Sequence, residues 1–331
     1  MAYTDIDDPT AYFQTKTYTG NGATSHAITF DGNSDLQPDF LWQKQRGGAT
    51  DHNLSNSVIG ATQGLSSNTN ESEQDNGTGY IRSFQSDGFT LGNSDKVNAN
   101  SSTNVAWGWK ETATAGFDIV SYSGSAASSK TISHSLSAVP KMIIVKCRSA
   151  DENWAVYHHA LGNTHALFLN TTGASSDTPV FADTTPTSSV FSVNADDRTG
   201  ADGKTYVAYV FAEKQGFSKF GSYTGNGNAD GTFVYTGFKP AFIMTKQTDG
   251  ADWWVINDTK RDTFNASTLG IRPNDSATES SDNAWTKDIL SNGFKHRTTN
   301  SGSNGSGNSY IYMAFAENPF VTSTGVPATA R

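Results

Sequence analysis

Short apolar runs alternate with polar clusters along the whole chain. Roughly every 8 to 15 residues, Gly, Asn, Asp and Ser interrupt the apolar pattern, which is the spacing typical of strands joined by turns. Residues 105–109 and 207–211 place large aromatic residues at every second position and mostly small residues between them. Because the side chains of a strand alternate between two faces, this pattern predicts strands with two different faces. We therefore expect many short strands and few helices.

Four landmarks recur three times, at intervals of about 100 residues. They are an aromatic-led turn, a proline followed by an apolar run that ends in lysine, a serine three residues before a phenylalanine, and an apolar closing segment. They occupy residues 18–22, 122–125 and 223–227; 38–44, 140–146 and 240–246; 86–89, 188–191 and 291–294; and 105–109, 207–211 and 311–315. Their constant order and spacing indicate three copies of one unit.

The repeats predict how the chain is divided. We expect an N-terminal arm, three units and a C-terminal tail, with the bounds 1–11, 12–113, 114–216, 217–320 and 321–331. The boundaries between units are very short, so the units should be docked on one another rather than joined by flexible linkers. The arm and the tail belong to no repeat, and we expect them to be attachment segments whose removal leaves the fold intact.

The fold of one unit follows from its second and fourth landmarks. In the second and third copies the proline-to-lysine run is apolar on both faces, which predicts a central strand covered from both sides. We place Trp42, Val145 and Met244 at equivalent positions on these strands. Two packed antiparallel sheets also account for the alternation in the closing segment. The prediction is an all-β fold of three tandem homologous antiparallel β-sandwich units, jelly-roll-like or lectin-like.

Composition narrows the possible partners. The 331 residues include 19 Phe, 12 Tyr and 7 Trp, enough apolar surface to form cores, and one cysteine, Cys147, expected to be a small buried residue. The formal net charge of -9 and the scattered Lys and Arg argue against nucleic acid as a partner. No apolar run is long enough to insert into a membrane, and the acidic start does not resemble a secretory signal.

A resemblance to a known family rests on several of these segments. Residues 6–22, 37–42, 83–89, 105–110 and 217–227 resemble an uncharacterised repeat domain of virion structural proteins from tailed, mostly marine, bacteriophages. Members of that family are often labelled tail-fibre-like or lectin-like. The resemblance implies a virion location and provides no catalytic residues. The first copy departs from the other two, because it has His52 where they have tryptophan-containing strands.

Enzymatic and metal-binding constellations are weak in this sequence. His158 and His159 are adjacent, so on a strand they should face opposite sides, and neither recurs in the other units. The acidic residues near Asp196 are typical of a solvated turn, and we expect no hydrolase activity and no cofactor. One weak candidate for calcium is the oxygen set of that loop, Asn194, Asp196 and Asp202.

Aromatic residues provide the other candidate site. Trp154, Trp253 and Trp254 lie beside Asn and Asp residues, a combination suited to stacking on a sugar ring while the polar groups bond its hydroxyls. Packing in a core or between units is the alternative. We expect one of Trp253 and Trp254 to be buried and the other to be open to solvent, because they alternate on a strand.

The leading functional prediction is a structural component of a bacteriophage virion, either tail- or fibre-associated or decorating the head. It would act through protein–protein contacts with other virion proteins and with itself, as a homotrimer. The alternative is a carbohydrate-binding module that recognises host surface glycans. A tailspike-like depolymerase is the third reading, disfavoured because the sequence lacks shaft repeats and an evident acidic cleft.

Overall fold

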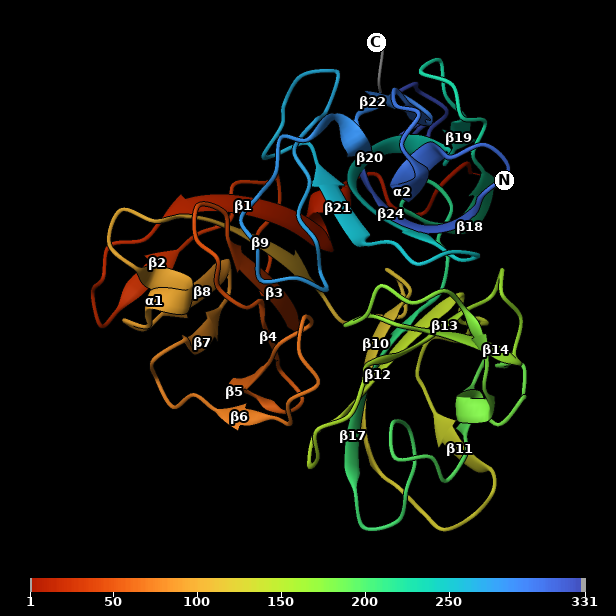
Figure 1. Ribbon diagram of the computed structural model, residues 1–331. Coiled ribbons are helices and arrows are strands. Elements are labelled where there is room, and N and C mark those ends of the chain that lie inside the picture. The colour runs from red at the N-terminus through yellow and green to blue at the C-terminus, as the bar shows by residue number, and fades with distance from the viewer. Residues whose placement is uncertain (1, 329–331) are drawn as a thin grey trace.

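The computed structural model describes residues 2–328. Strands dominate it, and they form six antiparallel sheets (Figure 1). Within the described residues, the α-helices are two single turns, α1 (Asp95–Asn98) and α2 (Ser301–Asn304). Three short 3-10 turns cover Pro9–Ala11, Pro179–Phe181 and Asn283–Trp285. The predicted all-β class with few helices is confirmed.

Each of three consecutive parts of the chain contributes one large and one small sheet. We call residues 12–113, 114–216 and 217–320 the first, second and third segments. The large sheets have the orders β1-β9-β3-β4-β5-β6, β10-β17-β12-β13-β14-β15 and β18-β24-β20-β21. In that order their strands are β1 (Phe13–Thr19), β9 (Thr103–Trp109), β3 (Phe40–Gln45), β4 (Asn53–Asn56), β5 (Gly60–Leu65), β6 (Gln74–Asp75); β10 (Phe117–Ser123), β17 (Thr205–Phe211), β12 (Met142–Cys147), β13 (Ala155–His158), β14 (His165–Phe168), β15 (Ser176–Asp177); and β18 (Ser218–Thr224), β24 (Ser309–Pro319), β20 (Phe238–Gln247), β21 (Trp254–Asp258).

The small sheets are built from the remaining strands. Their orders are β2-β8-β7 in the first segment, β11-β16 in the second and β19-β23-β22 in the third. The strands are β2 (His26–Ile28), β8 (Gly88–Leu91), β7 (Ile81–Gln85); β11 (Lys130–Ser133), β16 (Val190–Val193); and β19 (Phe233–Tyr235), β23 (Gly293–His296), β22 (Lys287–Leu290).

The pairing register identifies equivalent positions in the three large sheets. Trp42 of β3 lies opposite Trp107 of β9, and Met244 of β20 lies opposite Met313 of β24. In the second segment the residue opposite the corresponding Tyr209 is Ile144. Val145 is therefore one position out of register, and Ile144 is the true counterpart of Trp42. This one-residue correction matters because it changes the face of the sheet to which the side chain points.

The central strands are buried on both faces. In β3, Phe40 and Trp42 belong to one hydrophobic cluster, whereas Leu41 belongs to another, which also contains residues of the small sheet β2-β8-β7. The second segment repeats this division. Ile144 lies in the same cluster as Phe40 and Trp42, whereas Val145 lies in a cluster with residues of the small sheet β11-β16. Each large sheet in these two segments thus has its small sheet on one face and the rest of the molecule on the other.

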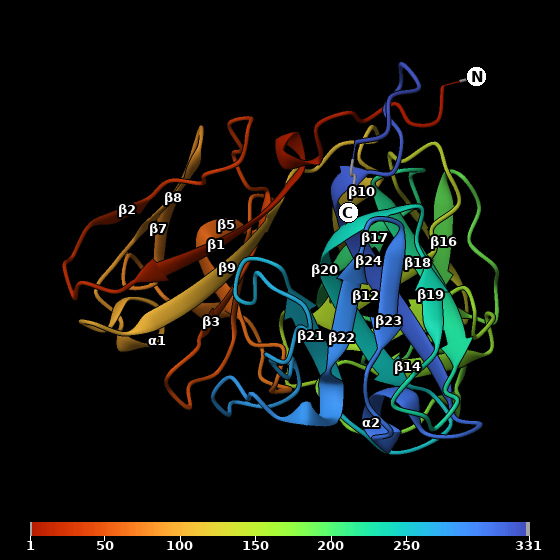
Figure 2. The same ribbon diagram turned by 90° about the horizontal axis from the view of Figure 1, so that it is seen from above.

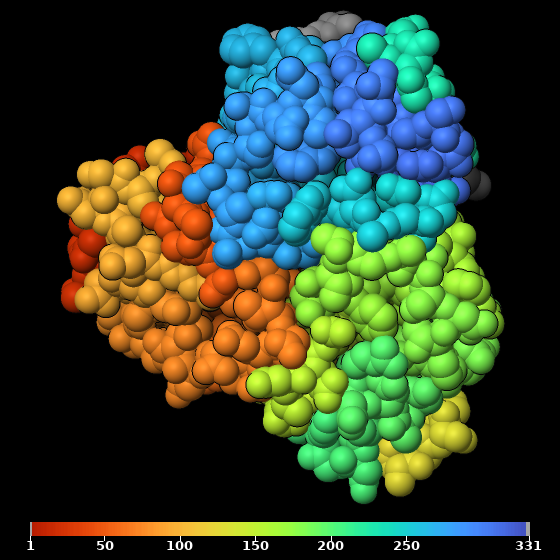
Figure 3. Space-filling view, in the orientation of Figure 1, coloured from red at the N-terminus to blue at the C-terminus, as the bar shows by residue number. Residues whose placement is uncertain are grey.

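The three segments lie against one another in the space-filling view (Figure 3), and a single aromatic core joins them. Phe13 of the first segment stacks on Phe315 of the third, with ring centroids 5.2 Å apart. Phe40 of the first segment packs on Tyr209 of the second at 4.4 Å. Phe211 of the second packs on Phe315 at 6.1 Å, which closes the circle. In the second view strands β1 and β9 of the first segment lie on the left, and the large-sheet strands of the second and third segments lie on the right (Figure 2).

The two terminal segments are packed on the body rather than projecting from it. Tyr3 Oη donates to the carbonyl of Gly237 at 2.6 Å, Thr4 Oγ1 donates to the carbonyl of Gln215 at 2.8 Å, and Ile6 is 3% exposed. Asp7 accepts a hydrogen bond from the backbone N–H of Ser323 at 2.6 Å. Residues 2–7 therefore pack on the second and third segments and on the tail.

Candidate functional site

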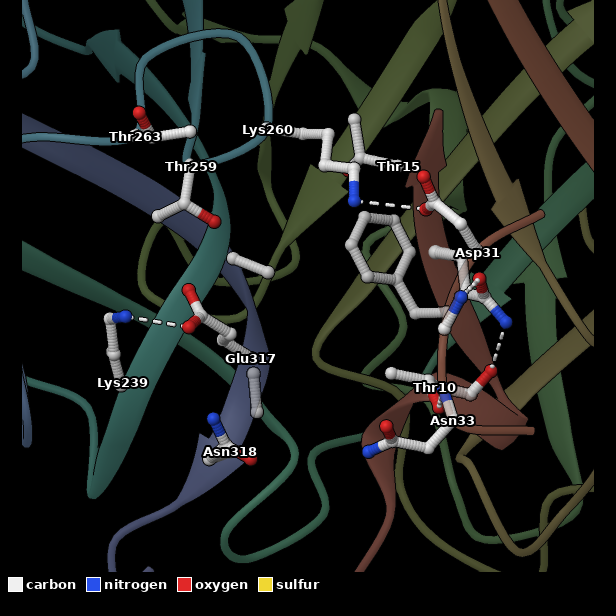
Figure 4. A pocket seen from close by; sticks show the side chains of 15 residues that line it. Thr10, Thr15, Asp31, Asn33, Lys239, Thr259, Lys260, Thr263, Glu317 and Asn318 are labelled. Carbon is white, nitrogen blue, oxygen red and sulfur yellow. Dashed lines mark hydrogen bonds and ion pairs between the residues drawn. The ribbon is translucent and has the colours of Figure 1, made fainter. Parts of the chain in front are cut away.

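A groove opens where the first and third segments meet, at the boundary that no linker crosses (Figure 4). Its volume is about 430 Å³. Strand β1 and the loop that follows β2 form one side, and the ends of β20, β21 and β24 form the other. Its lining residues are Thr10, Phe13, Gln14, Thr15, Asp31, Gly32, Asn33, Lys239, Ala241, Thr259, Lys260, Thr263, Ala316, Glu317 and Asn318.

Two ion pairs set the charge of this groove. Asp31 of the first segment bonds Lys260 of the third at 2.9 Å, and it also bonds Lys16 at 3.2 Å. Partial burial alone would raise the pKa of Asp31, but the two lysines hold it below its usual value. On the other side, Lys239 bonds Glu317 at 2.6 Å. Figure 4 shows the Asp31–Lys260 and Lys239–Glu317 pairs as two separate bridges.

Neutral polar groups fix the first-segment side of the groove. Gln14 donates from Nε2 to the carbonyls of Thr10 and Ser34 and accepts at Oε1 from the backbone N–H of Gly32. Gly32 is required there, because a Cβ would lie 2.6 Å from the Gln14 side chain. The side chain of Gln14 is thus immobilised, and the loop it holds presents Asp31 and Asn33 to the groove.

The charged groups of the groove are paired with one another. Its carboxylates are ion-paired with lysines, so neither is a free general base. Residues 2–328 contain no group of three or more His, Cys, Asp and Glu residues placed to hold a metal ion. Alternating charges, amides and hydroxyls in a shallow site match a hydroxyl-rich or zwitterionic ligand.

Trp154 and Trp254 are not available to a ligand. Their exposed fractions are 0% and 1%. Each donates its indole N–H across a seam, by which we mean a boundary between two segments. Trp154 Nε1 bonds the carbonyl of Ser66 in the first segment at 3.0 Å, and Trp254 Nε1 bonds the carbonyl of Phe168 in the second at 3.2 Å. Of the two interpretations left open by the sequence, packing between units fits these positions and sugar stacking does not.

His52 is the counterpart of these tryptophans in the first segment. The backbone N–H of His52, Trp154 and Trp254 bonds the side-chain oxygen of an asparagine in each case, namely Asn68, Asn170 and Asn274. The His52 ring also reaches across a seam, with Nε2 3.0 Å from the carbonyl of Arg272 in the third segment. Three equivalent side chains therefore make polar contacts across the three seams in cyclic order, and Trp154 Nε1 also contacts the carbonyl of Thr69 at 3.2 Å.

Trp253 has a different environment. It is half-buried, and the guanidinium of Arg272 lies over its ring at 4.6 Å. This cation–π contact occupies one face of the indole. Trp254 is buried as one of the expected pair, but Trp253 precedes β21 and is half-buried rather than open to solvent, and the face that a sugar would use is covered by a side chain of the same segment.

His158 and His159 do not face opposite sides. Their ring centroids are 5.1 Å apart, and both rings approach backbone carbonyls of the third segment, those of Tyr312 at 3.3 Å and Phe220 at 3.0 Å. The alternation fails because β13 ends at His158, so His159 already belongs to the turn. Burial lowers the pKa of His158 to about 3, which keeps the ring neutral. Both histidines are seam residues.

The calcium candidates are also engaged within the chain. Both carboxylate oxygens of Asp196 bond Arg198 at 2.7 Å, and burial opposed by this pairing leaves the pKa of Asp196 below its usual value. Asn194 Oδ1 accepts from the backbone N–H of Asp196 at 3.1 Å, and Asp202 is exposed. The oxygens of Asn194 and Asp196 thus cap a turn, and the three residues form no cation cage.

The lysine that ends the second landmark is buried in each segment. Lys44, Lys146 and Lys246 are 1%, 0% and 0% exposed, and burial lowers the pKa of each to about 8. Lys146 donates to the carbonyl of Asn70 in the first segment at 3.0 Å, and Lys246 to that of Thr172 in the second at 3.2 Å. Lys44 instead donates to the carbonyls of Gln45 and Gly48 in its own segment, so a seam contact accounts for the buried lysine only in the second and third segments.

Sequence reasoning missed the groove because its residues come from five stretches of two segments. None of Asp31, Lys239, Lys260 and Glu317 belongs to a motif. The one signal was the third seam itself, since three docked units joined by two linkers leave one boundary without a covalent connection.

Comparison with known proteins places the chain in a family without assigning an activity. No helix within residues 2–328 is long and apolar enough to span a membrane. No curated protein matches the chain at a significant level. A family model described as a domain of unknown function (DUF7483) matches residues 8–319, a range that includes almost all of the three segments. The protein belongs to the DUF7483 family.

Proposed function

We propose that the three segments are copies of one β-sandwich unit and that the chain is a structural building block. The shared strand order supports the first part: in each large sheet the first strand of the segment pairs with its last strand, which pairs with the proline-to-lysine strand. The small sheets each contain the strand that carries the third landmark. The jelly-roll or lectin-like type of the sandwich belongs to this proposal.

The structural role rests on one observation: buried polar side chains form hydrogen bonds between segments. His52, Trp154 and Trp254, together with the landmark lysines Lys146 and Lys246, bond backbone carbonyls of another segment. A buried polar group without a partner costs free energy, so these contacts fix the relative positions of the segments. A chain built in this way is a rigid body arranged about one axis, a property that suits an assembly component.

Bacteriophage virions are the proposed setting, as a tail- or fibre-associated protein or a head-decorating protein without enzymatic activity. The motifs shared with phage structural proteins support this setting. The partners are other virion proteins and further copies in a homotrimer. Because the large sheets already pack inside one chain, such copies meet through outer surfaces, where Phe233, Tyr235 and Phe264 are 44%, 54% and 80% exposed.

Localisation in particles tests this proposal. We expect mass spectrometry of purified virions to detect the chain and electron microscopy to place it at a position of threefold symmetry. Replacing Phe264 and Tyr235 by serine should lower incorporation, whereas replacing the exposed Asp177 by asparagine should not. Particles that never contain the chain, or a protein that stays monomeric at every concentration, would contradict the proposal.

Glycan binding is the second candidate, and the groove between the first and third segments favours it. Its ion pairs and amides can hydrogen-bond hydroxyl groups. A glycan array with the wild-type chain and with an Asp31→Asn/Glu317→Gln variant tests it, with Asp177→Asn as the matched control. Binding that is lost only in the groove variant would support this role, and the absence of binding to any host glycan would exclude it.

A further inference from the structure

The third segment buries a lysine that has no acidic partner. Lys287 of β22 is 0% exposed, and its Nζ contacts Asn257 Oδ1 at 2.6 Å and the carbonyl of Trp285 at 3.4 Å. Among the ion pairs of residues 2–328, none includes Lys287. Burial lowers the pKa of this amine to about 7. A large fraction of the amine is therefore uncharged at neutral pH, the form in which an amine is a nucleophile.

The amide of Asn257 is held in place beside this amine. Asn257 of β21 is 0% exposed, and its Nδ2 donates to the carbonyl of Leu269 at 3.1 Å. That bond orients Oδ1, and with it the amide carbon, toward Lys287. Two reacting groups fixed in contact at a fully buried position have a high effective concentration.

A third group can carry the proton that the reaction must move. His296 of β23 lies directly opposite Lys287 in the β22–β23 hairpin, and paired residues on adjacent strands project to the same face. It is 0% exposed, and neither ring nitrogen has a hydrogen-bond partner. Burial lowers the pKa of His296 well below its usual value, with a further contribution from Lys287, so the ring is neutral.

The other two segments show that the fold does not need these residues. In the first segment the hairpin pair equivalent to Lys287 and His296 is Ile81 and Leu91, both fully buried. In the second segment the position of His296 is occupied by Val193, two residues after the landmark phenylalanine as in the other copies. Asn257 likewise corresponds to Ser55 and Tyr157, three residues after His52 and Trp154. Only the third segment combines amine, amide and imidazole.

We propose that Lys287 and Asn257 form an intramolecular isopeptide bond, with His296 as the proton carrier. The uncharged Nζ attacks Cγ of Asn257, and a bond forms between these two atoms. The imidazole accepts a proton from Nζ and delivers it to Nδ2, whereupon the bond between Cγ and Nδ2 breaks and ammonia leaves. No oxidant or reductant is needed, and the imidazole is regenerated. The product is a secondary amide that links β21 of the large sheet to β22 of the small sheet.

This link would close a loop that contributes to the groove. The chain between the two residues includes Thr259, Lys260 and Thr263, which line the groove, and the exposed Phe264. A covalent closure restricts the unfolded chain more than the folded one, so it stabilises the third segment. It would also remove a buried ionisable amine.

Mass spectrometry of the purified full chain tests the proposal. We expect an intact mass below the sequence mass by one ammonia. Trypsin should fail to cut after Lys287, and residues 247–260 should be recovered joined to residues 262–295 as one branched peptide. The branched peptide distinguishes the link from cyclisation of asparagine, which also releases ammonia. Recovery of linear residues 247–260 and 262–287 from a chain of full mass would overturn the proposal.

Matched variants separate chemistry from folding. The double variant Lys287→Ile/His296→Leu installs the pair found in the first segment, and Asn257→Ser installs the residue of that segment. We expect both to fold, with unchanged far-ultraviolet circular dichroism, and to lose the branched peptide completely. His296→Leu alone should retain Lys287 and Asn257 but link at least tenfold more slowly. Equal linking in His296→Leu would overturn the role of the imidazole, and a branched peptide that persists in Asn257→Ser would overturn the assignment of the link to Asn257.

Discussion

Arg148 of the second segment and Glu73 of the first form a two-point ion pair across their seam, with Nε–Oε2 and Nη2–Oε1 distances of 2.7 Å and 3.0 Å. Arg46 and Glu279 repeat this pair between the first and third segments. At the remaining seam the equivalent residues are Thr248 and Ser175. The same backbone hydrogen bond is nevertheless present at all three seams. The N–H of Glu73 donates to the carbonyl of Arg148, that of Glu279 to Arg46, and that of Ser175 to Thr248.

The missing third pair can be installed. We predict that Thr248→Arg combined with Ser175→Glu raises the free energy of unfolding by about 1 kcal/mol at low salt. The reason is that the Arg–Glu pairs at the other two seams are bidentate and partly buried. Chemical denaturation of the double variant and both single variants measures the coupling. The gain should shrink at high salt. A coupling of zero in the double-mutant cycle would contradict the structural equivalence of the three seams.

Much of the fold could be predicted because strands and turns depend on the pattern of apolar and polar residues close together in the sequence. The alternation of residues 105–109 gave the two faces of β9, and its large residues Trp107 and Trp109 lie in the shared core while Ala106 faces the small sheet. The repeated landmarks predicted which strands occupy equivalent places in the three segments, and the shared pairing of those strands agrees with this. What failed was fine register, as for Val145, since a shift of one residue leaves an apolar run apolar.

The interactions across seams could not be predicted, because they join residues distant in sequence. Trp154 beside Asn153 has the composition of a sugar site, and only the docking of the first segment against it shows that the ring is covered. The groove depends on the same docking. The cluster of Lys287, Asn257 and His296 was also invisible, since a lysine in a strand of alternating polarity indicates a solvated face.

Truncating Trp154 tests whether the seams determine stability. We predict that Trp154→Ala lowers the free energy of unfolding by about 4 kcal/mol, because it leaves a cavity and two carbonyls without their donor. Trp253→Ala should cost only about 1 kcal/mol, since that ring is half-buried and loses a cation–π contact. Denaturant titrations of both variants provide the comparison. Similar small losses in the two variants would contradict the assignment of Trp154 to the shared core.

Acid should weaken the seam between the second and third segments. The folded pKa of His158 is about 3, against an ordinary value of 6.5, so between these values the unfolded chain binds more protons than the folded chain. The free energy of unfolding therefore falls as the pH falls below 6.5. Glu111 opposes this trend, because burial and the neighbouring Asp118 raise its folded pKa to about 7, and it adds stability as the pH falls from 7 toward 4.5.

A variant isolates the contribution of the histidine. His158→Asn introduces the residue found at the equivalent Asn56, and Glu111 is the same in both proteins. We predict that the slope of unfolding free energy against pH between 4 and 6 is smaller in the variant by about 1.4 kcal/mol per pH unit, the value for one proton. Denaturation at several pH values measures both slopes. Equal slopes would show that His158 is protonated in the folded protein.

The N-terminal residues should be part of the folded body rather than a detachable arm. Deleting residues 1–7 removes the buried Ile6, the hydrogen bond of Tyr3 to the third segment, that of Thr4 to the second, and the contact of Asp7 with Ser323. Burial of one isoleucine side chain contributes about 2 kcal/mol and each hydrogen bond about 1 kcal/mol. We therefore predict that the deletion lowers the free energy of unfolding by about 4 kcal/mol, the sum for the Ile6 side chain and the hydrogen bonds of Tyr3 and Thr4, and that Ile6→Ala accounts for about half of the loss. Asp5→Ala, at an exposed position between Thr4 and Ile6, should have no effect.

Because the truncated chain is destabilised, poor incorporation into particles would not by itself identify the arm as an attachment segment. If the deletion and Ile6→Ala both unfold at the wild-type denaturant concentration, the arm is dispensable for the fold, and its contacts with the third segment do not stabilise the closed arrangement.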